Sequence, residues 1–212
     1  FALEGELEAR SRNWAGAASA YAAALQRQPV TDLAIRLHQA LLTAGKPAEA
    51  ERAAADWLKA HPKDGVFIYH LGDLAAAAKD WPRAEAQYRA VLALQPRHAA
   101  AMNNIAWLLA TQRKPGAVAM ADQALALLPD RATMLDTLAF AQESENQLGK
   151  AVDTQKRAVE LEPRNPMLRL RLAQLHIKKG DKSDARELLQ ALAQLGPSFG
   201  AQAEVASLLK SL

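Results

Sequence analysis

The chain has 212 residues with a net charge of +3; half of the residues are hydrophobic, 5% are aromatic and none is cysteine. The absence of cysteine excludes disulfides, thiolate chemistry and cysteine-based zinc or iron–sulfur sites. The small, evenly spread charge argues against a nucleic-acid partner. Because no apolar stretch of 18 residues occurs, we expect no transmembrane segment in this sequence.

Prolines divide the chain at a nearly constant interval of 33 or 34 residues. They are Pro29, Pro62, Pro96, Pro129, Pro163 and Pro197. A fixed period of this length is typical of a stack of one supersecondary unit. Alanine is abundant and alternating β-branched runs are absent, so the fold class is predicted to be all-α.

In chain order, the period predicts six helix–turn–helix units followed by one closing helix. The predicted ranges are 1–29, 30–62, 63–96, 97–129, 130–163, 164–197 and, for the closing helix, 198–212. The proline at the end of each unit stops the second helix, because it lacks an N–H and clashes with the preceding turn. Pro47, Pro82 and Pro115 are expected to begin second helices, where the missing N–H costs nothing. Gly45 and Gly180 are expected to end first helices.

The two ends of the chain differ in this register. Phe1 takes the fourth position of its unit, so the start of that first helix is missing and we expect further repeats upstream. After Pro197, apolar residues at helical spacing predict a helix that caps the last unit. These residues are Val205, Leu208, Leu209 and Leu212.

The residues between the prolines also repeat. In the third unit, repeat positions 7, 8, 20, 24 and 32 hold Leu71, Gly72, Ala84, Tyr88 and Pro96. This pattern resembles the tetratricopeptide repeat, which has Leu-Gly, Ala, an aromatic residue and Pro at those positions. The resemblance covers nearly the whole chain; the second and fourth units are weaker, with Ala54 and Ala121 at the aromatic position.

The resemblance implies an α-solenoid, a right-handed superhelix of about thirteen helices in antiparallel pairs. The small residue at position 20 lets the two helices of a repeat approach closely. We therefore expect Ala84, Ala151 and Ala185 to be almost fully buried where those helices cross.

No motif indicates catalysis. The histidines are His38, His61, His70, His98 and His176. No two have the i,i+4 spacing of a helical metal site, and phosphate loops and nucleophile elbows are absent. We predict that the chain is not an enzyme and holds no metal or cofactor. His38 and His176 are expected in the packed interior, His61 and His98 in solvent, and His70 in an exposed polar contact with Asp73.

In tetratricopeptide proteins the first helices of successive repeats line a concave groove. The resemblance places at groove positions Tyr69, Asp73, Asn103, Trp107, Asp136, Phe140 and Gln174. The three aromatic residues would form a row flanked by polar groups, a combination that favours binding. The alternative is that these rings fill gaps between adjacent first helices. Arg169 and Arg171 are interpreted as solvated.

Family members that bind chaperone tails hold a terminal carboxylate with a Lys/Asn clamp. Tyr69 and Asp73 stand at the clamp positions of the third unit here, so that mode of binding is not expected. The expected partner is a protein or peptide in the groove. Polysaccharide is a second class of ligand, because rows of aromatic rings can stack on sugars.

Two stretches narrow the resemblance further. Residues 103–110 (NNIAWLLA) and 135–139 (LDTLA) resemble bacterial tetratricopeptide proteins, including predicted lipoproteins, that accompany exopolysaccharide and exosortase (PEP-CTERM) systems. This implies an interaction scaffold within a larger cell-envelope protein, tethered in the periplasm, a location we favour over the cytoplasm. The alternatives are a cytosolic adaptor or co-chaperone and a repeat region that regulates an attached enzyme.

Overall fold

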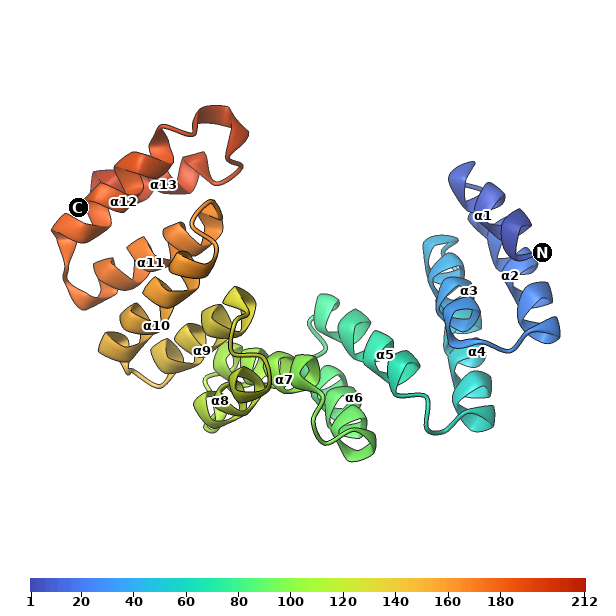
Figure 1. The fold of residues 1–212 in the computed structure, drawn as a ribbon. Helices are drawn as coiled ribbons and strands as arrows, with labels where there is room; N and C mark the ends of the chain where they lie inside the picture. Colours follow the sequence, from blue (N-terminus) through green and yellow to red (C-terminus); the bar gives the residue numbers. More distant parts are fainter. The chain divides into compact units, whose positions relative to one another are not determined.

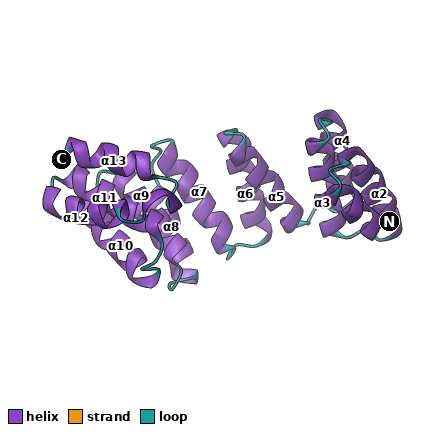
Figure 2. Ribbon diagram, turned by 90° about the horizontal axis from the view of Figure 1, so that it is seen from above, coloured by secondary structure: helices purple, strands orange, loops and turns teal.

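A computed structural model describes all 212 residues, and helices are its only regular elements (Figures 1 and 2). Thirteen α-helices and one short 3₁₀ helix at Gly196–Ser198 confirm the expected all-α fold. The α-helices are α1 (Ala2–Arg10), α2 (Trp14–Arg27), α3 (Thr31–Thr43), α4 (Pro47–Ala60), α5 (Gly65–Ala77), α6 (Trp81–Leu94), α7 (Ala99–Thr111), α8 (Ala117–Leu127), α9 (Ala132–Ser144), α10 (Leu148–Leu161), α11 (Pro166–Lys179), α12 (Lys182–Ala193) and α13 (Gln202–Ser211).

The chain divides into two compact units. The N-terminal unit, Phe1–Pro96, contains α1 to α6, and the C-terminal unit, Arg97–Leu212, contains α7 to α13. Within each unit, helices pack mainly against the helices next to them in the sequence. First helices of neighbouring pairs also touch, α3 with α5 and α7 with α9. Each unit is therefore a stack of helix pairs.

Prolines and side-chain caps begin several second helices. Pro47 is the first residue of α4, and Pro82 lies in the first turn of α6. Before α6, the Asp80 carboxylate accepts a hydrogen bond from the Arg83 N–H at 3.2 Å, which satisfies one of the free donors of that turn. The expectation for Pro115 is wrong: α8 begins at Ala117, because Gly116 precedes it with a left-handed backbone (φ 91°).

A left-handed residue closes the turn inside each helix pair. Gly45 and Gly180 occupy such turns with φ of 74° and 95°, as expected at the ends of first helices. The corresponding turns of other pairs hold Lys79, Arg113 and Asn146, with φ of 60°, 52° and 60°. A left-handed conformation costs residues that have a Cβ about 1–2 kcal/mol, so the helix pairing on both sides holds these turns in place.

The Leu-Gly signature of the third pair has a packing reason. A Cβ at Gly72 would lie 2.7 Å from Cε1 of Tyr88, closer than real Cβ contacts. Glycine therefore lets the Tyr88 ring lie flat against α5, where only 2% of the tyrosine is exposed. The Tyr88 hydroxyl donates to the Asp73 carboxylate at 2.7 Å.

The small residues at the helix crossings are buried as predicted. Ala84, Ala151 and Ala185 have no exposed surface. Around Ala151, the side chains of Ala139, Leu172 and Leu175 form one apolar cluster between α9, α10 and α11.

Replacing Ala151 with leucine is expected to lower the free energy of unfolding by about 1–3 kcal/mol, because the added carbons overpack this crossing. Thermal unfolding of the full chain measures the effect. The exposed Ala126 of α8 provides the matched control, and Ala126→Leu should leave the midpoint nearly unchanged. Equal midpoints for the two variants would contradict the crossing assignment.

The closing helix α13 covers the last pair. Val205 is fully buried against Leu189 and Leu192 of α12, and Leu170 of α11 belongs to the same cluster. The other residues of the predicted apolar stripe pack partly against this cluster: Leu208, Leu209 and Leu212. The apolar stripe after Pro197 therefore forms the helix that the sequence pattern indicates.

Candidate functional site

Two of the predicted groove aromatics meet in the C-terminal unit. The rings of Trp107 on α7 and Phe140 on α9 lie 6.5 Å apart, tilted by 46°. Trp107 stays 40% exposed, whereas Phe140 is half-buried. Trp107 therefore packs on its neighbour and still offers ring surface to a ligand.

Arg171 of α11 extends this pair of rings across a third first helix. Its guanidinium carbon lies 4.6 Å from the centre of the Phe140 ring, within cation–π range. Its Nη2 donates to Oε2 of Glu143 at 2.6 Å, and Lys178 pairs with the other oxygen of Glu143. We call Trp107, Phe140 and Arg171 the aromatic–arginine row.

The interpretation of Arg171 as a solvated residue is wrong. Its side chain is only 25% exposed, because Phe140 and Glu143 on α9 hold it down. Arg169 is half-buried as well, and its Nε is buried without a hydrogen-bond partner. Arg171 does not stand at a groove position of the repeat. It belongs to the row because it contacts Phe140 and Glu143 on the neighbouring helix α9.

The polar residues predicted beside the row differ in their surroundings. The Asp136 carboxylate accepts a hydrogen bond at 2.8 Å from Gln155 of α10, which is fully buried. Asp136 is therefore tied to the interior of its helix pair. Asn103 lies one turn before Trp107 on the same face of α7, and its Oδ1 is buried without a hydrogen-bond partner.

Gln174, also predicted in the groove, faces the closing helix. Its side-chain amide donates to Glu204 of α13 at 2.7 Å. The preceding groove position of α11, Leu170, is buried under the same helix. The aromatic–arginine row therefore ends where α13 covers α11.

Tyr69 and Asp73 lie on α5, in the N-terminal unit. Asp73 is exposed and accepts the hydrogen bond from Tyr88, and the Tyr69 ring lies 5.4 Å from the Tyr88 ring. Both side chains thus contact their own helix pair. The participation of Tyr69 in one row with Trp107 and Phe140 stays a prediction.

Two histidines of neighbouring first helices contact each other, one of them buried and the other half-buried. His38 Nδ1 on α3 lies 3.2 Å from His70 Nε2 on α5, and His38 is 3% exposed. Burial and the nearby His70 lower the pKa of His38 to about 4. Burial also lowers the pKa of His70, against the opposing charge of Asp73. His70 is half-buried, so the predicted exposed setting of this residue is wrong, whereas its contact with Asp73 stays a prediction.

The remaining histidines also have protein partners. His176 is buried, as expected for a packing position. The ring of His61 stacks on Trp57 with centroids 3.8 Å apart, and His98 Nδ1 accepts a hydrogen bond from the Ala101 N–H. The expectation that His61 and His98 are solvated is wrong, since both side chains are half-buried.

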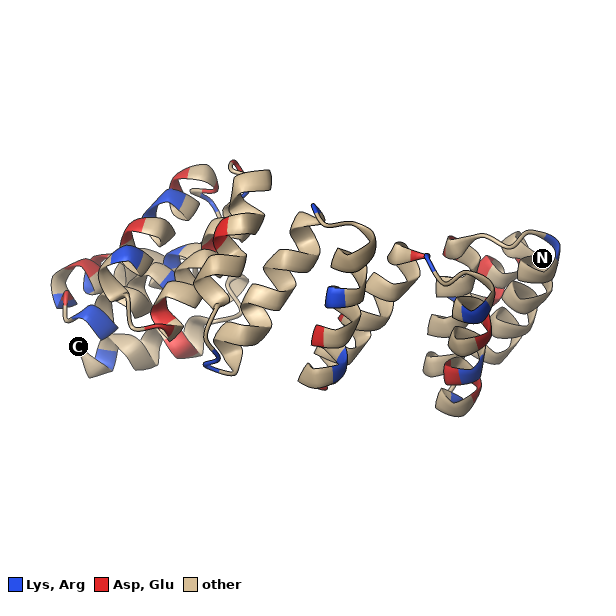
Figure 3. Cartoon of the chain, turned by 90° about the horizontal axis from the view of Figure 1, so that it is seen from below, with Lys and Arg blue, Asp and Glu red and all other residues tan.

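Charge is mixed over the surface of both units. Lysine and arginine occur among aspartate and glutamate in both units (Figure 3). Helix α7 carries no charged residue. None of the helices combines the length and the apolar character that crossing a membrane requires. The uncharged α7 places Trp107 in a neutral setting.

Comparison with known proteins places the chain among helical repeats. Family models described as tetratricopeptide repeat match residues 35–87, 69–132 and 142–212. Cellulose synthase operon protein C of Pseudomonas fluorescens (strain SBW25) is 26% identical over 173 residues, which cover 73% of this chain. The chain spans 13% of the length of that protein.

Solved structures give the same result. MamA (residues 41 to the end) from Desulfovibrio magneticus RS-1 matches with a TM-score of 0.70 and 26% identity, over 79% of this chain and 95% of MamA. A thermophilic tetratricopeptide protein of Thermus thermophilus matches with a TM-score of 0.66 and 21% identity, over 85% and 99% of the two chains. PilW, a widely conserved type IV pilus biogenesis factor, matches with a TM-score of 0.66 and 20% identity, over 85% and 92%.

Proposed function

The chain belongs to the tetratricopeptide repeat family, and we propose that it is a protein–protein interaction scaffold that binds its partner at the aromatic–arginine row. Tetratricopeptide repeats are interaction modules, and their fold is typically a non-catalytic scaffold. The observation that carries the proposal is the exposed ring of Trp107 beside Phe140, whose ring Arg171 contacts in turn. Aromatic and arginine side chains are the residues most enriched at interface hot spots.

The chemistry of this surface favours a polypeptide segment with an apolar side chain. Trp107 offers a large exposed apolar area on a helix that carries no charged residue, so an apolar side chain of the partner can pack on it. One turn away, the half-buried side chain of Asn103 adds a polar amide group to this surface.

Replacing Trp107 with alanine is expected to weaken partner binding by more than 1 kcal/mol, because truncation of a central interface aromatic typically has at least this effect. The partner is isolated from the source organism on the immobilised chain, and its affinity is then measured for each purified variant. Leu161→Ala is the matched control, since Leu161 is 45% exposed at the end of α10, away from the row.

Circular dichroism establishes that both variants remain helical. Unchanged affinity of a folded Trp107→Ala variant would move the binding site elsewhere, to the convex face or to other repeats. Loss of the fold would instead favour the alternative that Trp107 fills a gap between first helices.

We also propose that the chain is a module of a larger bacterial envelope protein linked to exopolysaccharide synthesis or exosortase systems. The likeness to cellulose synthase operon protein C supports the link to polysaccharide synthesis. Residues 103–110 and 135–139, with their resemblance to envelope-associated repeat proteins, support the same assignment. On this proposal the protein acts in the periplasm, as part of a membrane-tethered lipoprotein.

Fractionation of the source organism tests the location. The full-length protein, tagged at its C-terminus, should appear in membrane or periplasmic fractions and should co-purify with polysaccharide-assembly or sorting proteins. Recovery in the cytosol with chaperones would favour the adaptor alternative. A catalytic domain found within the full-length polypeptide would favour the alternative of a repeat region that regulates an attached enzyme.

A further inference from the structure

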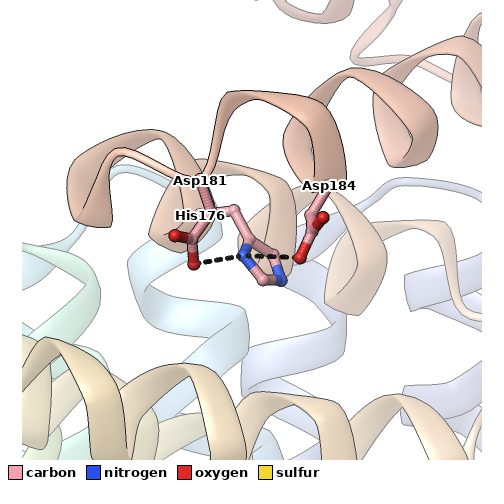
Figure 4. A group of neighbouring side chains, drawn as sticks. All are labelled: His176, Asp181 and Asp184. Carbon is pink, nitrogen blue, oxygen red and sulfur yellow. Dashed lines mark hydrogen bonds and ion pairs between the residues drawn. The ribbon is translucent and has the colours of Figure 1, made fainter.

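Three metal-ligating side chains converge at the turn between α11 and α12 (Figure 4). His176 lies in the last turn of α11, Asp181 is the residue before α12, and Asp184 lies in the first turn of α12. His176 Nδ1 is 3.2 Å from Oδ2 of Asp181 and 3.7 Å from Oδ2 of Asp184. All three ligand atoms lie within 4.8 Å of one another. Figure 4 shows the imidazole between the two carboxylates.

The packing of the helix pair fixes the imidazole. His176 is only 2% exposed, whereas the side chains of Asp181 and Asp184 are 32% and 56% exposed. The ring is therefore held by the interior, and the carboxylates reach it from the solvent side. A metal ion could enter from that side and find the nitrogen ligand already in place.

Asp181 is directed toward His176 and away from its own helix. Aspartate before a helix usually accepts a hydrogen bond from a backbone N–H of the first turn. Asp64 and Asp80 do so before α5 and α6, but the Asp181 carboxylate makes no such bond to α12. Its Oδ2 instead faces His176 and the Lys179 ammonium, 2.7 Å away.

Hydrogen bonding within the cluster accounts for only part of this geometry. Nδ1 of a histidine carries at most one proton, so it can donate well to only one carboxylate at a time. Zinc binds nitrogen and oxygen ligands at about 2.0–2.1 Å, which places neighbouring ligands of a tetrahedral ion about 3.3 Å apart. The separations of 3.2 and 3.7 Å lie on either side of that value.

We propose that His176 Nδ1 and the carboxylates of Asp181 and Asp184 form a three-ligand site for a divalent transition-metal ion such as Zn²⁺. One nitrogen and two oxygen ligands suit Zn²⁺ and its neighbours, whereas Mg²⁺ and Ca²⁺ take oxygen ligands. The remaining coordination position is open to water or to a group of a partner. The ion would join α11 to α12 directly and stabilise the last helix pair.

Lys179 gives this site a distinctive property. Its ammonium group donates a hydrogen bond to Oδ2 of Asp181, the same oxygen that faces His176. A metal ion that takes this oxygen as a ligand therefore competes with the lysine. Removing the lysine charge should therefore strengthen metal binding. A purely structural hydrogen-bond cluster would show no such response.

Calorimetric titration of the full chain with ZnCl₂, with MgCl₂ as the comparison ion, tests the proposal. We expect saturable Zn²⁺ binding, at least tenfold weaker binding in Asp184→Asn and tighter binding in Lys179→Met. Asp153→Asn is the matched control: Asp153 also acts on the charge of Lys179 and is exposed, but it is not a ligand. This variant loses the same charge and should bind within about twofold of the unmodified chain.

Because Asp184 is exposed, Asp184→Asn should keep its helical content, which circular dichroism checks. The proposal is overturned if the unmodified chain shows no saturable Zn²⁺ binding. It is also overturned if Asp184→Asn binds as well as Asp153→Asn, or if Lys179→Met fails to bind more tightly.

Discussion

Replacing Trp57 with alanine is expected to lower the free energy of unfolding of the N-terminal unit by about 3–5 kcal/mol. Trp57 is 7% exposed in α4 and belongs to an apolar cluster with Phe67 and Leu71 of α5. One face of the indole stacks on His61, and its Nε1 donates to Oδ2 of Asp64 at 2.8 Å. Alanine removes the packing, the stacking and the hydrogen bond together.

Trp57→Phe separates these contributions. Phenylalanine keeps an aromatic ring in the cluster but loses the bond to Asp64 and the part of the packing that the larger indole makes; Asp64 retains its bonds from Thr31 and from the Phe67 N–H. A hydrogen bond to a charged group contributes about 1.5–3 kcal/mol, so the phenylalanine variant should be the more stable of the two. Urea denaturation of the full chain, followed by circular dichroism, measures both. Equal losses would contradict a contribution from the aromatic ring that phenylalanine retains.

Acidification is expected to destabilise the N-terminal unit between about pH 6.5 and pH 4. His38 has a folded-state pKa of about 4, below the value near 6.5 of an unfolded histidine. In this interval the unfolded state binds more protons than the folded state, so stability falls as pH falls. The loss is complete below the folded-state pKa and is on the order of 3 kcal/mol, because each unit of pKa difference corresponds to about 1.4 kcal/mol. The lowered pKa of His70 acts in the same direction.

The charges around the histidine pair oppose one another. Glu51 raises the pKa of His38 and Arg83 lowers it, while Asp73 raises the pKa of His70. Burial is the largest cause for both rings, so a neutral replacement should remove most of the pH dependence. His38→Gln should flatten the profile of unfolding free energy against pH, measured by urea denaturation at several pH values. His61→Gln, in the same unit, is the control, and a profile as steep in His38→Gln as in this control would contradict the assignment.

The fold was predictable because its signals are local. The prolines at 33- or 34-residue spacing and the small residues at the crossings act within one helix pair, where sequence rules apply. The turns inside the pairs were only partly predictable. Gly45 and Gly180 mark two of them, but Lys79 and Arg113 adopt the same left-handed backbone without a glycine signal. There, tertiary packing overrides the local preference.

The candidate site was less predictable, because it depends on side chains that reach a neighbouring helix. The register of the repeat gave Trp107 and Phe140 groove positions, but it left out Arg171, whose partner Glu143 lies on the preceding first helix. The pair of His38 and His70 was missed for a similar reason.

A search for polar partners one repeat apart would have found some of these pairs. Three contacts of the N-terminal unit join residues 32 or 33 positions apart, close to the repeat period. They are Thr31 with Asp64, His38 with His70, and Glu51 with Arg83. Such spacing places the two partners at matching positions of adjacent repeats, which a search within single helices overlooks.

The restriction of packing to helices close in sequence affects how the chain acquires its structure. In each unit, a helix packs mainly on the one before it, the one after it or the next first helix, and no extensive pairing requires a distant segment to return. The contact order is therefore low, and low contact order favours rapid folding. Each helix pair can form on the ribosome as soon as its own residues and those of its neighbour have emerged. A protein built this way exposes little unpaired apolar surface while the rest of its polypeptide is still being synthesised.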